Sequence, residues 1–339
     1  MEKLKCAVIG CGGLGHVHMK NLLTMDDVQL TALCDIDETQ FTRSVKTNLD
    51  RTDTLDLSGV RTYTDAQELL DKEALDFVVI ALPTYLHAPY SIMALDKGLH
   101  VFCEKPMSTT LEGCRSMVEA AKRNGKLLTV GQVLRFSYPY RLIKEAYETG
   151  MYGKLLRLDL RRDSHPPIWG SNNWFMDFDR SGGAVIDLHV HDVDYLNYLL
   201  GMPDALVSDA YHVRSGFDCI STQYFYKDGP MVHSASDWNM PVSHGFQPVT
   251  TAVFEKALIA INKHGFKVYV DDKVLEEKDF DAKSTGADPY YDEMRHFIYC
   301  IRQGVDNEIV PMESTMQSIE IVTAEIKSAK TRTIVQLKK

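Results

Sequence analysis

The stretch KCAVIGCGGLG, residues 5–15, determines how the first half of the chain is expected to fold. Residues 5–9 form an apolar run typical of a buried strand, and a helical pattern follows the glycines. Between the two lie Gly10, Gly12 and Gly15, spaced as G-x-G-x-x-G. A plain glycine-rich turn would show the same letters, but the strand before and the helix after them favour a dinucleotide-binding turn.

Each glycine has a separate physical task in such a turn. Gly10 permits the tight bend, Gly12 lets a pyrophosphate approach the backbone, and Gly15 allows the helix to pack closely on the strand. The free N–H groups at the helix N-terminus attract the phosphates. Gly13 and Leu14 lie at this N-terminus, and we expect them to contact the cofactor as well.

Asp35 ends the next predicted strand, residues 28–34, and stands twenty residues after Gly15. A carboxylate at this distance accepts hydrogen bonds from a ribose diol and repels a 2′-phosphate. No arginine follows it directly. The sequence therefore favours NAD over NADP as the cofactor. The other interpretation is that Asp35 only caps the next helix.

Strands and helices continue to alternate as far as residue 130. Alternation of this kind predicts the α/β fold class, with an N-terminal Rossmann domain built on a doubly wound parallel sheet. The further strands are expected at residues 76–82, 100–104 and 127–130, and the helices at 87–97 and 111–123.

Ligands bind doubly wound sheets at the carboxyl ends of the strands. Pro83 and His87 follow one predicted strand, and Glu104 and Lys105 end the next, just before Pro106. An unpaired buried charge is costly, so Lys105 should be paired or face a cleft. We expect the side chains of Pro83, His87, Glu104 and Lys105 to line the cofactor crevice. A salt-bridged lysine at a strand end is the simpler interpretation.

A boundary near residue 130 divides the chain into an NAD-binding domain, 1–130, and a domain for substrate binding and oligomerisation, 131–339. Repeated extended segments predict an α/β domain with a large, open-faced, mostly antiparallel sheet. Helices should cover one face, and the uncovered face indicates a homodimer or homotetramer. The extended segments are 154–162, 221–226, 232–238, 250–254 and 258–262, and the helices are 141–149, 290–303 and 314–330.

A second polar group lies within residues 183–200, where one continuous helix is expected. Asp187, His191 and Asp194 would share one face of it, among apolar neighbours. A carboxylate one turn from an imidazole can orient the ring and raise its basicity. The other interpretation is a capping cluster at the helix start. His189 lies off this face and is assigned a secondary role.

Residues 163–175 combine prolines, amides and tryptophans, which suits either a loop over a polar ring-shaped ligand or an ordinary anchored loop. A metal site of His189, His191 and Asp192 is disfavoured because side chains two residues apart diverge on a helix, so no metal is expected. The expected substrate contacts are Arg135, His165, Trp174, His189 and Tyr290.

Composition narrows the class of protein further. The 339 residues carry a formal net charge of −10, which gives no indication of a nucleic-acid or anionic-membrane partner. No apolar run reaches membrane-spanning length, and no signal sequence is apparent. The seven cysteines have no metal-like spacing, which fits buried thiols in a reducing cytoplasm.

The motifs occur in one order along nearly the whole chain. They are Gly10-x-Gly12-x-x-Gly15, Asp35, Pro83…His87, Glu104-Lys105-Pro106, Gly182-Gly183 and Asp187-x-x-x-His191-x-x-Asp194. On these motifs the sequence resembles the glucose–fructose oxidoreductase / inositol dehydrogenase / rhizopine-catabolism (Gfo/Idh/MocA) family. The resemblance implies a Rossmann domain followed by an open-faced sheet domain, frequent dimers or tetramers, and NAD(P)-linked redox chemistry on sugars and cyclitols. His189 replaces a small residue of many relatives, which leaves the substrate open.

The groups available indicate a mechanism. His191 is the expected general base, since imidazole titrates near neutral pH. Lys105, protonated, would hold the substrate hydroxyl and steady developing alkoxide charge, and Asp187 would orient His191. The expected function is hydride transfer between nicotinamide and a secondary hydroxyl or ketone of a sugar, cyclitol or sugar derivative. Two alternatives remain: an NAD-assisted, redox-neutral lyase or hydrolase acting on a glycoside or anhydro-sugar, and a non-catalytic cofactor-binding regulator.

Overall fold

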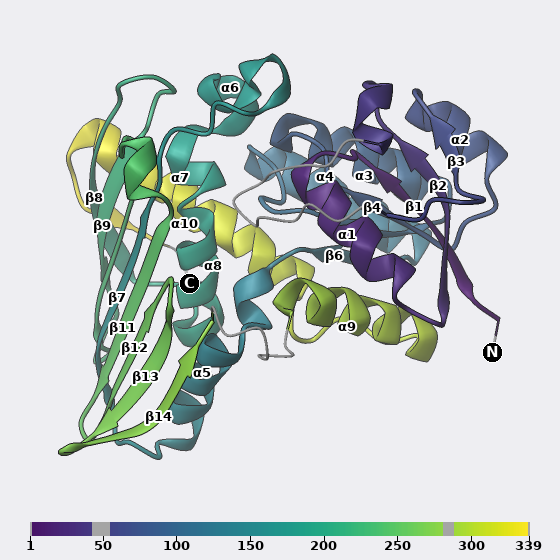
Figure 1. Cartoon of the computed structure of the whole chain (residues 1–339). Coiled ribbons are helices and arrows are strands. Elements are labelled where there is room, and N and C mark those ends of the chain that lie inside the picture. Colours follow the sequence, from purple (N-terminus) through teal and green to yellow (C-terminus); the bar gives the residue numbers. More distant parts are fainter. Residues whose placement is uncertain (1, 43–54, 281–287, 338–339) are drawn as a thin grey trace. The chain divides into compact units, whose positions relative to one another are not determined.

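The computed structural model (Figure 1) describes residues 2–42, 55–280 and 288–337 of the chain. Two units are distinguished, and each is built from two separate segments of sequence. The first unit comprises Met1–Val133 and Asp288–Met316, and the second comprises Leu134–Ala287 and Gln317–Lys339.

The first unit contains a six-stranded parallel sheet with the order β3-β2-β1-β4-β5-β6. Its strands are β1 (Leu4–Ile9), β2 (Val28–Cys34), β3 (Arg61–Tyr63), β4 (Phe77–Ile80), β5 (His100–Cys103) and β6 (Leu128–Val130). This topology confirms the predicted doubly wound sheet. Sequence reasoning missed β3, because its three residues are largely exposed and form no apolar run.

The helices of the first unit are α1 (Gly13–Leu23), α2 (Ala66–Lys72), α3 (His87–Asp96), α4 (Leu111–Asn124) and α9 (Pro289–Gln303). Local sequence explains their ends. For example, the Thr110 side chain accepts a hydrogen bond from the Gly113 N–H and begins α4, and Gly125 in a left-handed conformation ends it.

Helix α9 belongs to the first unit, although the sequence analysis placed every residue after 130 in the second domain. Its Phe297 ring packs edge-to-face on Phe77 and Phe102, at centroid distances of 5.5 and 5.6 Å. Figure 1 shows the helix beside α1. Burial of this apolar face holds Asp288–Met316 against the parallel sheet.

The second unit contains a nine-stranded sheet with the order β14-β13-β12-β11-β7-β10-β9-β8-β15. Among the described strands, β7 and β10 run parallel and the other neighbouring pairs run antiparallel, as predicted. The strands are β7 (Leu155–Asp163), β8 (Ala205–Tyr211), β9 (Cys219–Phe225), β10 (Met231–Asp237), β11 (Gln247–Phe254), β12 (Leu258–Asn262), β13 (Gly265–Val270), β14 (Lys273–Asp279) and β15 (Val335–Gln336).

Helices of the second unit lie along one face of this sheet in Figure 1. They are α5 (Tyr138–Thr149), α6 (Phe178–Ser181), α7 (Gly183–Asp187), α8 (Val190–Leu200) and α10 (Met312–Thr331), of which α10 begins in the first unit. Alternate residues of β9 and β10 are buried, which is the pattern of strands covered on one face.

The single helix expected over residues 183–200 is two helices, α7 and α8. The N–H of His189 bonds to the carbonyl of Ala184, five residues back, at 2.8 Å. This π-type turn inserts one residue into the helical repeat and rotates everything after it. His191 and Asp194, which both follow this turn, therefore do not continue the helical face of Asp187, and the prediction of one polar stripe on one helix was wrong.

Candidate active site

The glycine turn of the first unit has the geometry that its sequence predicts. Gly10 has φ +93°, and a Cβ there would lie 2.4 Å from the carbonyl oxygen of Ala81. A Cβ on Gly15 would lie 1.9 Å from the carbonyl oxygen of Gly10. Both positions therefore require glycine because the backbone itself approaches closely.

Gly12 differs from Gly10 and Gly15, because a Cβ added there would meet no atom of the described residues within 4 Å. Gly12 is also the N-cap of α1, and no side chain caps the helix. The protein thus keeps a side-chain-free space at an uncapped helix N-terminus, which fits a cofactor pyrophosphate.

Asp35 lies at the end of β2 and holds the glycine turn. Its Oδ2 accepts a hydrogen bond from the Cys11 N–H at 2.8 Å, and its Oδ1 accepts one from the Asp37 N–H at 3.0 Å. The next helical turn, η1 (Glu38–Phe41), is capped by Asp37 and not by Asp35. The interpretation of Asp35 as a simple helix cap is therefore wrong.

His87 begins α3, directly after Pro83 and the short helix η2 (Thr84–Leu86), and its side chain is 1% exposed. Its Nδ1 lies 2.7 Å from the carbonyl oxygen of Pro106, and its Nε2 lies 2.7 Å from that of Leu82. Burial lowers the pKa of His87, while the two carbonyls oppose that shift. Both ring nitrogens are engaged by backbone, so His87 shapes the loops that end β4 and β5; the structure gives it no ring nitrogen for the expected cofactor contact.

Glu104 turns into the core of the first unit, where it is 4% exposed. Its Oε1 accepts a hydrogen bond from His18 Nε2 at 2.6 Å, and its Oε2 accepts one from the backbone N–H of Lys105 at 3.1 Å. Lys105 itself is partly exposed, and the peptide bond to Pro106 is cis. Glu104 is therefore better placed to support Lys105 than to bind a cofactor, which was its expected role.

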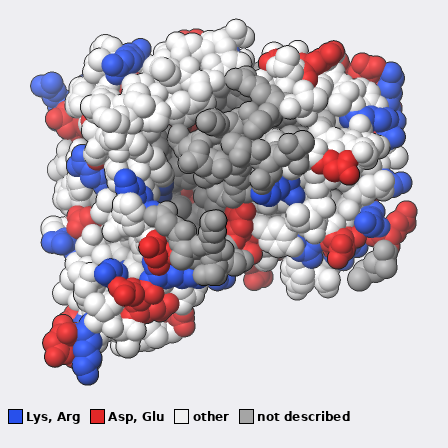
Figure 2. Space-filling model, viewed as in Figure 1, with Lys and Arg blue, Asp and Glu red and all other residues white. Residues whose placement is uncertain are grey.

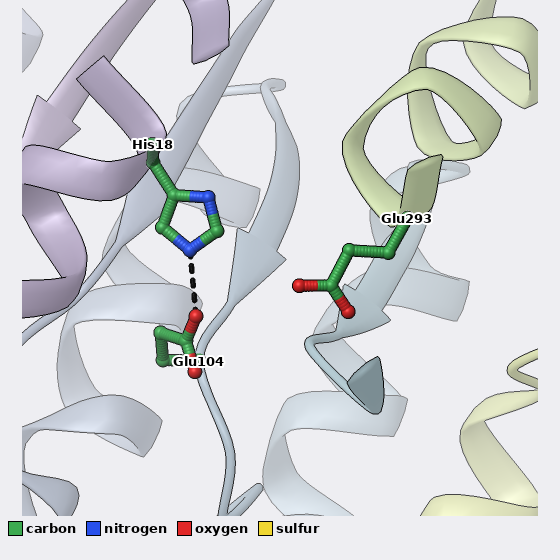
Figure 3. Close-up of side chains that lie close together, drawn as sticks. All are labelled: His18, Glu104 and Glu293. Carbon is green, nitrogen blue, oxygen red and sulfur yellow. Dashed lines mark hydrogen bonds and ion pairs between the residues drawn. The ribbon is translucent and has the colours of Figure 1, made fainter. Parts of the chain in front are cut away.

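His18 and Glu293 are polar residues that sequence reasoning missed. Figure 3 shows the Glu293 carboxyl directed at the His18–Glu104 pair. Burial, followed by the charges of Glu104 and Asp288, raises the pKa of Glu293 well above its ordinary value. The available signal was weak: a glutamate on the apolar face of a distant helix, and a histidine three residues after Gly15.

Asp187 and His191 remain the candidate catalytic pair of the second unit. Asp187 ends α7 and His191 is the second residue of α8, and both are partly exposed. The turn between them is fixed by His189, whose side chain is fully buried. A rigid turn between two functional side chains suits a site that must hold one geometry.

His189 is part of a buried polar cluster and is not placed to contact a substrate. Its Nδ1 lies 2.9 Å from Ser236 Oγ, and its Nε2 lies 3.2 Å from Glu325 Oε1 and 3.3 Å from the Tyr224 hydroxyl. The Tyr224 hydroxyl also donates a hydrogen bond to Glu325. Strands β9 and β10 and helix α10 thus anchor the α7–α8 turn through this one ring.

Two glycines support the start of α7. Gly182 and Gly183 have φ +76° and +67°, and a Cβ on Gly183 would lie 2.8 Å from the carbonyl oxygen of Phe217. That carbonyl accepts the Ala184 N–H at 2.9 Å. Asp218, which follows Phe217, is buried. Its carboxylate accepts hydrogen bonds from the backbone N–H groups of residues 213–215, from the Ser215 hydroxyl and from the Trp238 indole N–H.

Arg135 was expected to bind substrate, but it is fully buried. Its Nε donates to Asp194 Oδ2 at 2.8 Å and its Nη2 to Asp194 Oδ1 at 2.7 Å, a bidentate ion pair. The Ser318 hydroxyl donates to the same carboxylate at 2.9 Å. Arg135 and Asp194 therefore join α8 to the chain before α5 and to α10.

The loop between β7 and α6 is held by its own aromatic side chains. Trp174 is 9% exposed and stacks on Phe175 at a centroid distance of 3.8 Å, whereas Trp169 is 51% exposed. His165 lies 5.3 Å from the Trp169 ring. Trp174 is thus an anchor of the loop, and the exposed indole is Trp169. Tyr290, the remaining expected substrate contact, lies in α9 of the first unit.

The remaining features concern surface charge, membrane-spanning helices and potential metal ligands. In the described part of the face in Figure 2, Lys and Arg side chains are interspersed with Asp and Glu. No helix within the described ranges is long and apolar enough to cross a membrane. Among described residues, the group of potential metal ligands that lies together is His18, Glu104 and Glu293, and not the His189–His191–Asp192 set considered above.

Comparison with known proteins identifies the class of protein. The family of oxidoreductases with an NAD-binding Rossmann fold, Gfo/Idh/MocA, matches residues 4–132, and the C-terminal domain of the same family matches residues 140–260. The chain belongs to this family.

Relatives and solved structures agree with that assignment. The chain is 33% identical to myo-inositol 2-dehydrogenase of Thermotoga maritima over 202 residues, which are 58% of this chain and 55% of that protein, so the match spans about half of the relative's length. It is 25% identical to scyllo-inositol 2-dehydrogenase (NAD(+)) of Bacillus subtilis over 99% of this chain and 97% of the other. The crystal structure of myo-inositol 2-dehydrogenase from Lactobacillus plantarum has the same fold, with a TM-score of 0.80, 22% identity and coverage of 99% and 100%.

Proposed function

We propose that this protein is an NAD-dependent dehydrogenase that transfers a hydride between nicotinamide and a secondary hydroxyl or ketone of a cyclitol, sugar or sugar derivative. The observation that carries the proposal is the geometry of Gly12, at an uncapped helix N-terminus where an added Cβ would meet none of the described atoms within 4 Å. The substrate class is supported by the match to an NAD(+)-dependent inositol dehydrogenase along almost the full chain.

The first unit would bind the cofactor. The turn from Gly10 to Gly15 and the N–H groups of α1 hold the pyrophosphate, with Gly13 and Leu14 at its edge. Asp35, already fixed by the Cys11 N–H, accepts the ribose hydroxyls through its remaining lone pairs. Its negative charge favours NAD over NADP.

The chemical step would use Lys105, Asp187 and His191. NAD supplies hydride transfer when it is bound. His191 takes the proton from the substrate hydroxyl, and Asp187 orients the ring. The Lys105 ammonium donates a hydrogen bond to the same oxygen and stabilises the alkoxide charge that develops. Pro83 and Glu104 shape the loops beside Lys105. His165 and Tyr290 remain proposed substrate contacts, and so does the edge of Trp174, whose indole also anchors its own loop.

Purified protein tests the function directly. NADH formation is measured with cyclitols, aldoses and anhydro-sugars, each with NAD and with NADP. We expect NAD-dependent oxidation of a cyclitol or sugar, lowered roughly 100-fold or more in Lys105→Ala and His191→Ala. Normal turnover by Lys105→Ala, or an unchanged pH–rate profile in His191→Ala, contradicts the roles assigned. Substrate turnover without net NADH indicates the redox-neutral alternative, and NAD binding without any turnover indicates the regulator.

We further propose that the protein is a cytoplasmic homodimer or homotetramer that associates through the second sheet. Exposed apolar side chains lie on strands β8, β9 and β10 at positions that alternate with the buried ones, among them Tyr211, Phe225 and Met231, which are 41 to 56% exposed. The seven cysteines are free thiols, as in a reducing compartment. Light scattering of the purified protein tests the assembly: a monomer at micromolar concentration contradicts it.

A further inference from the structure

Three ionisable side chains from distant parts of the sequence meet in the core of the first unit. His18 comes from α1, Glu104 follows β5, and Glu293 comes from α9; they are 0%, 4% and 1% exposed. One ligand atom from each lies within 4.8 Å of the other two. Figure 3 shows that the Glu293 carboxyl points at the hydrogen-bonded His18–Glu104 pair.

Glu104 is the centre of this group. One carboxyl oxygen accepts from His18 Nε2 and the other from the Lys105 N–H, the pattern of an ionised carboxylate with two N–H donors. Among the described residues, His18 Nδ1 is buried without a partner, so Nε2 is assigned as the N–H that donates to Glu104. The carboxylate therefore joins the helix that follows the glycine turn to the backbone of Lys105.

Glu293 lies near this pair without a bond to it. Among the described residues, neither of its buried oxygens has a hydrogen-bond partner. A second buried charge next to Glu104 would be strongly unfavourable, so one of the two carboxyls must hold a proton. Glu104 already accepts two N–H bonds, so the proton resides on Glu293, which then adds no second negative charge within 4.8 Å of Glu104.

We propose that Glu293, as a neutral carboxylic acid, and His18 are positioning residues that orient Lys105 through the carboxylate of Glu104. His18 holds one oxygen of that carboxylate and the Lys105 N–H bonds to the other, while the uncharged Glu293 lies within 4.8 Å and leaves the negative charge on Glu104. The kinetic part of the proposal rests on the proposed function of Lys105.

A divalent cation held by the same three side chains is the competing explanation, since imidazole and carboxylates are metal ligands. The two explanations make opposite demands on Glu293. A neutral carboxylic acid can be replaced by glutamine, which has nearly the same shape, carries no charge and has an N–H group that can donate a hydrogen bond. An anionic metal ligand cannot be replaced in this way.

The experiment compares Glu293→Gln with Glu293→Leu, and uses Glu313→Gln as the matched control. Glu313 lies in the same unit in an exposed ion pair with Lys122, whose loss should have little effect. We expect Glu293→Gln to keep kcat within about threefold of the unaltered protein, and Glu293→Leu to lose roughly 10- to 100-fold in kcat with a much smaller change in KM for NAD. Equal losses in Gln and Leu variants, or one equivalent of tightly bound metal by elemental analysis, overturn the proposal.

Infrared spectroscopy tests the protonation without any substrate. The unaltered protein should show the carbonyl stretch of a buried protonated carboxylic acid, and this band should be absent from Glu293→Gln and present in Glu313→Gln. Absence of the band from the unaltered protein refutes the neutral acid even if Glu293→Leu fails to fold. If the band is present but no substrate is oxidised, the proposed function fails while the protonation of Glu293 stands.

Discussion

Breaking the ion pair between Arg135 and Asp194 should destabilise the second unit strongly. The two side chains are 0% and 1% exposed and share two charge-assisted hydrogen bonds of 2.8 and 2.7 Å. Asp194→Leu leaves the guanidinium buried without its counter-charge, and Arg135→Met leaves the carboxylate with the Ser318 hydroxyl. Removal of one partner of such a pair costs about 3–5 kcal/mol.

The double variant Arg135→Met/Asp194→Leu should be much less destabilised than the sum of the single variants. It replaces both charges with apolar side chains, and such replacements of buried pairs are often close to neutral. The difference between the sum and the double variant is the coupling energy of the pair, and single losses of about 3–5 kcal/mol with a nearly neutral double variant make it at least about 6 kcal/mol.

Urea unfolding followed by tryptophan fluorescence measures this coupling energy in the second unit, where the ion pair lies. All three tryptophans, residues 169, 174 and 238, belong to the second unit, so the signal reports on that unit. Single variants that lose less than about 1 kcal/mol, or single effects that simply add in the double variant, refute the assignment of a buried pair. A specific rise in substrate KM in the stable double variant would instead restore Arg135 as a substrate contact.

Three further predictions concern the glycine turn, cofactor choice and acid stability. Gly12→Ala should fold normally but bind NAD at least about tenfold more weakly by fluorescence titration. Gly15→Ala should also lower the unfolding midpoint. Of these two variants, it is the one whose new Cβ would lie 1.9 Å from a backbone oxygen. Asp35→Asn keeps an acceptor for the Cys11 N–H but removes the charge, so the ratio of kcat/KM for NAD over NADP should fall by about tenfold or more, and an unchanged ratio contradicts the ribose assignment. Burial would raise the pKa of Asp218, but its hydrogen bonds lower it from 3.8 to about 2. Asp218 thus contributes about 2 kcal/mol of stability above pH 4 that is lost as the pH falls toward 2, and Asp218→Asn should remove that part of the acid dependence of unfolding followed by tryptophan fluorescence.

Local sequence was sufficient for the parallel sheet and the cofactor turn. Residues 5–15 carry the strand, the glycines and the helix start in one continuous stretch, so their spacing alone reveals the geometry. The same holds for Asp35, which follows β2 directly. Short or exposed elements such as β3 carry no such pattern and were missed.

Helical periodicity misassigned the role of Asp194. A shared face for Asp187 and Asp194 requires an unbroken helix. The hydrogen bond from the His189 N–H to the Ala184 carbonyl instead inserts one extra residue between α7 and α8 and rotates α8. A local pattern cannot reveal this, because the turn is held by Ser236, Tyr224 and Glu325 from elements far along the chain.

By itself, the sequence determined the α/β class, the cofactor turn and the chemical groups available for redox catalysis, because each depends on neighbours within one strand–turn–helix. Only the tertiary structure decided which polar residues are buried supports. It turned Arg135, His189 and Glu104 inward to partners 59, 136 and 86 residues away, and it brought α9 back to the first sheet. Whether a charged side chain of this protein acts in catalysis or supports the core depends on the partner that it meets in the folded structure. Because that partner is far away in the sequence, no local sequence pattern reveals it.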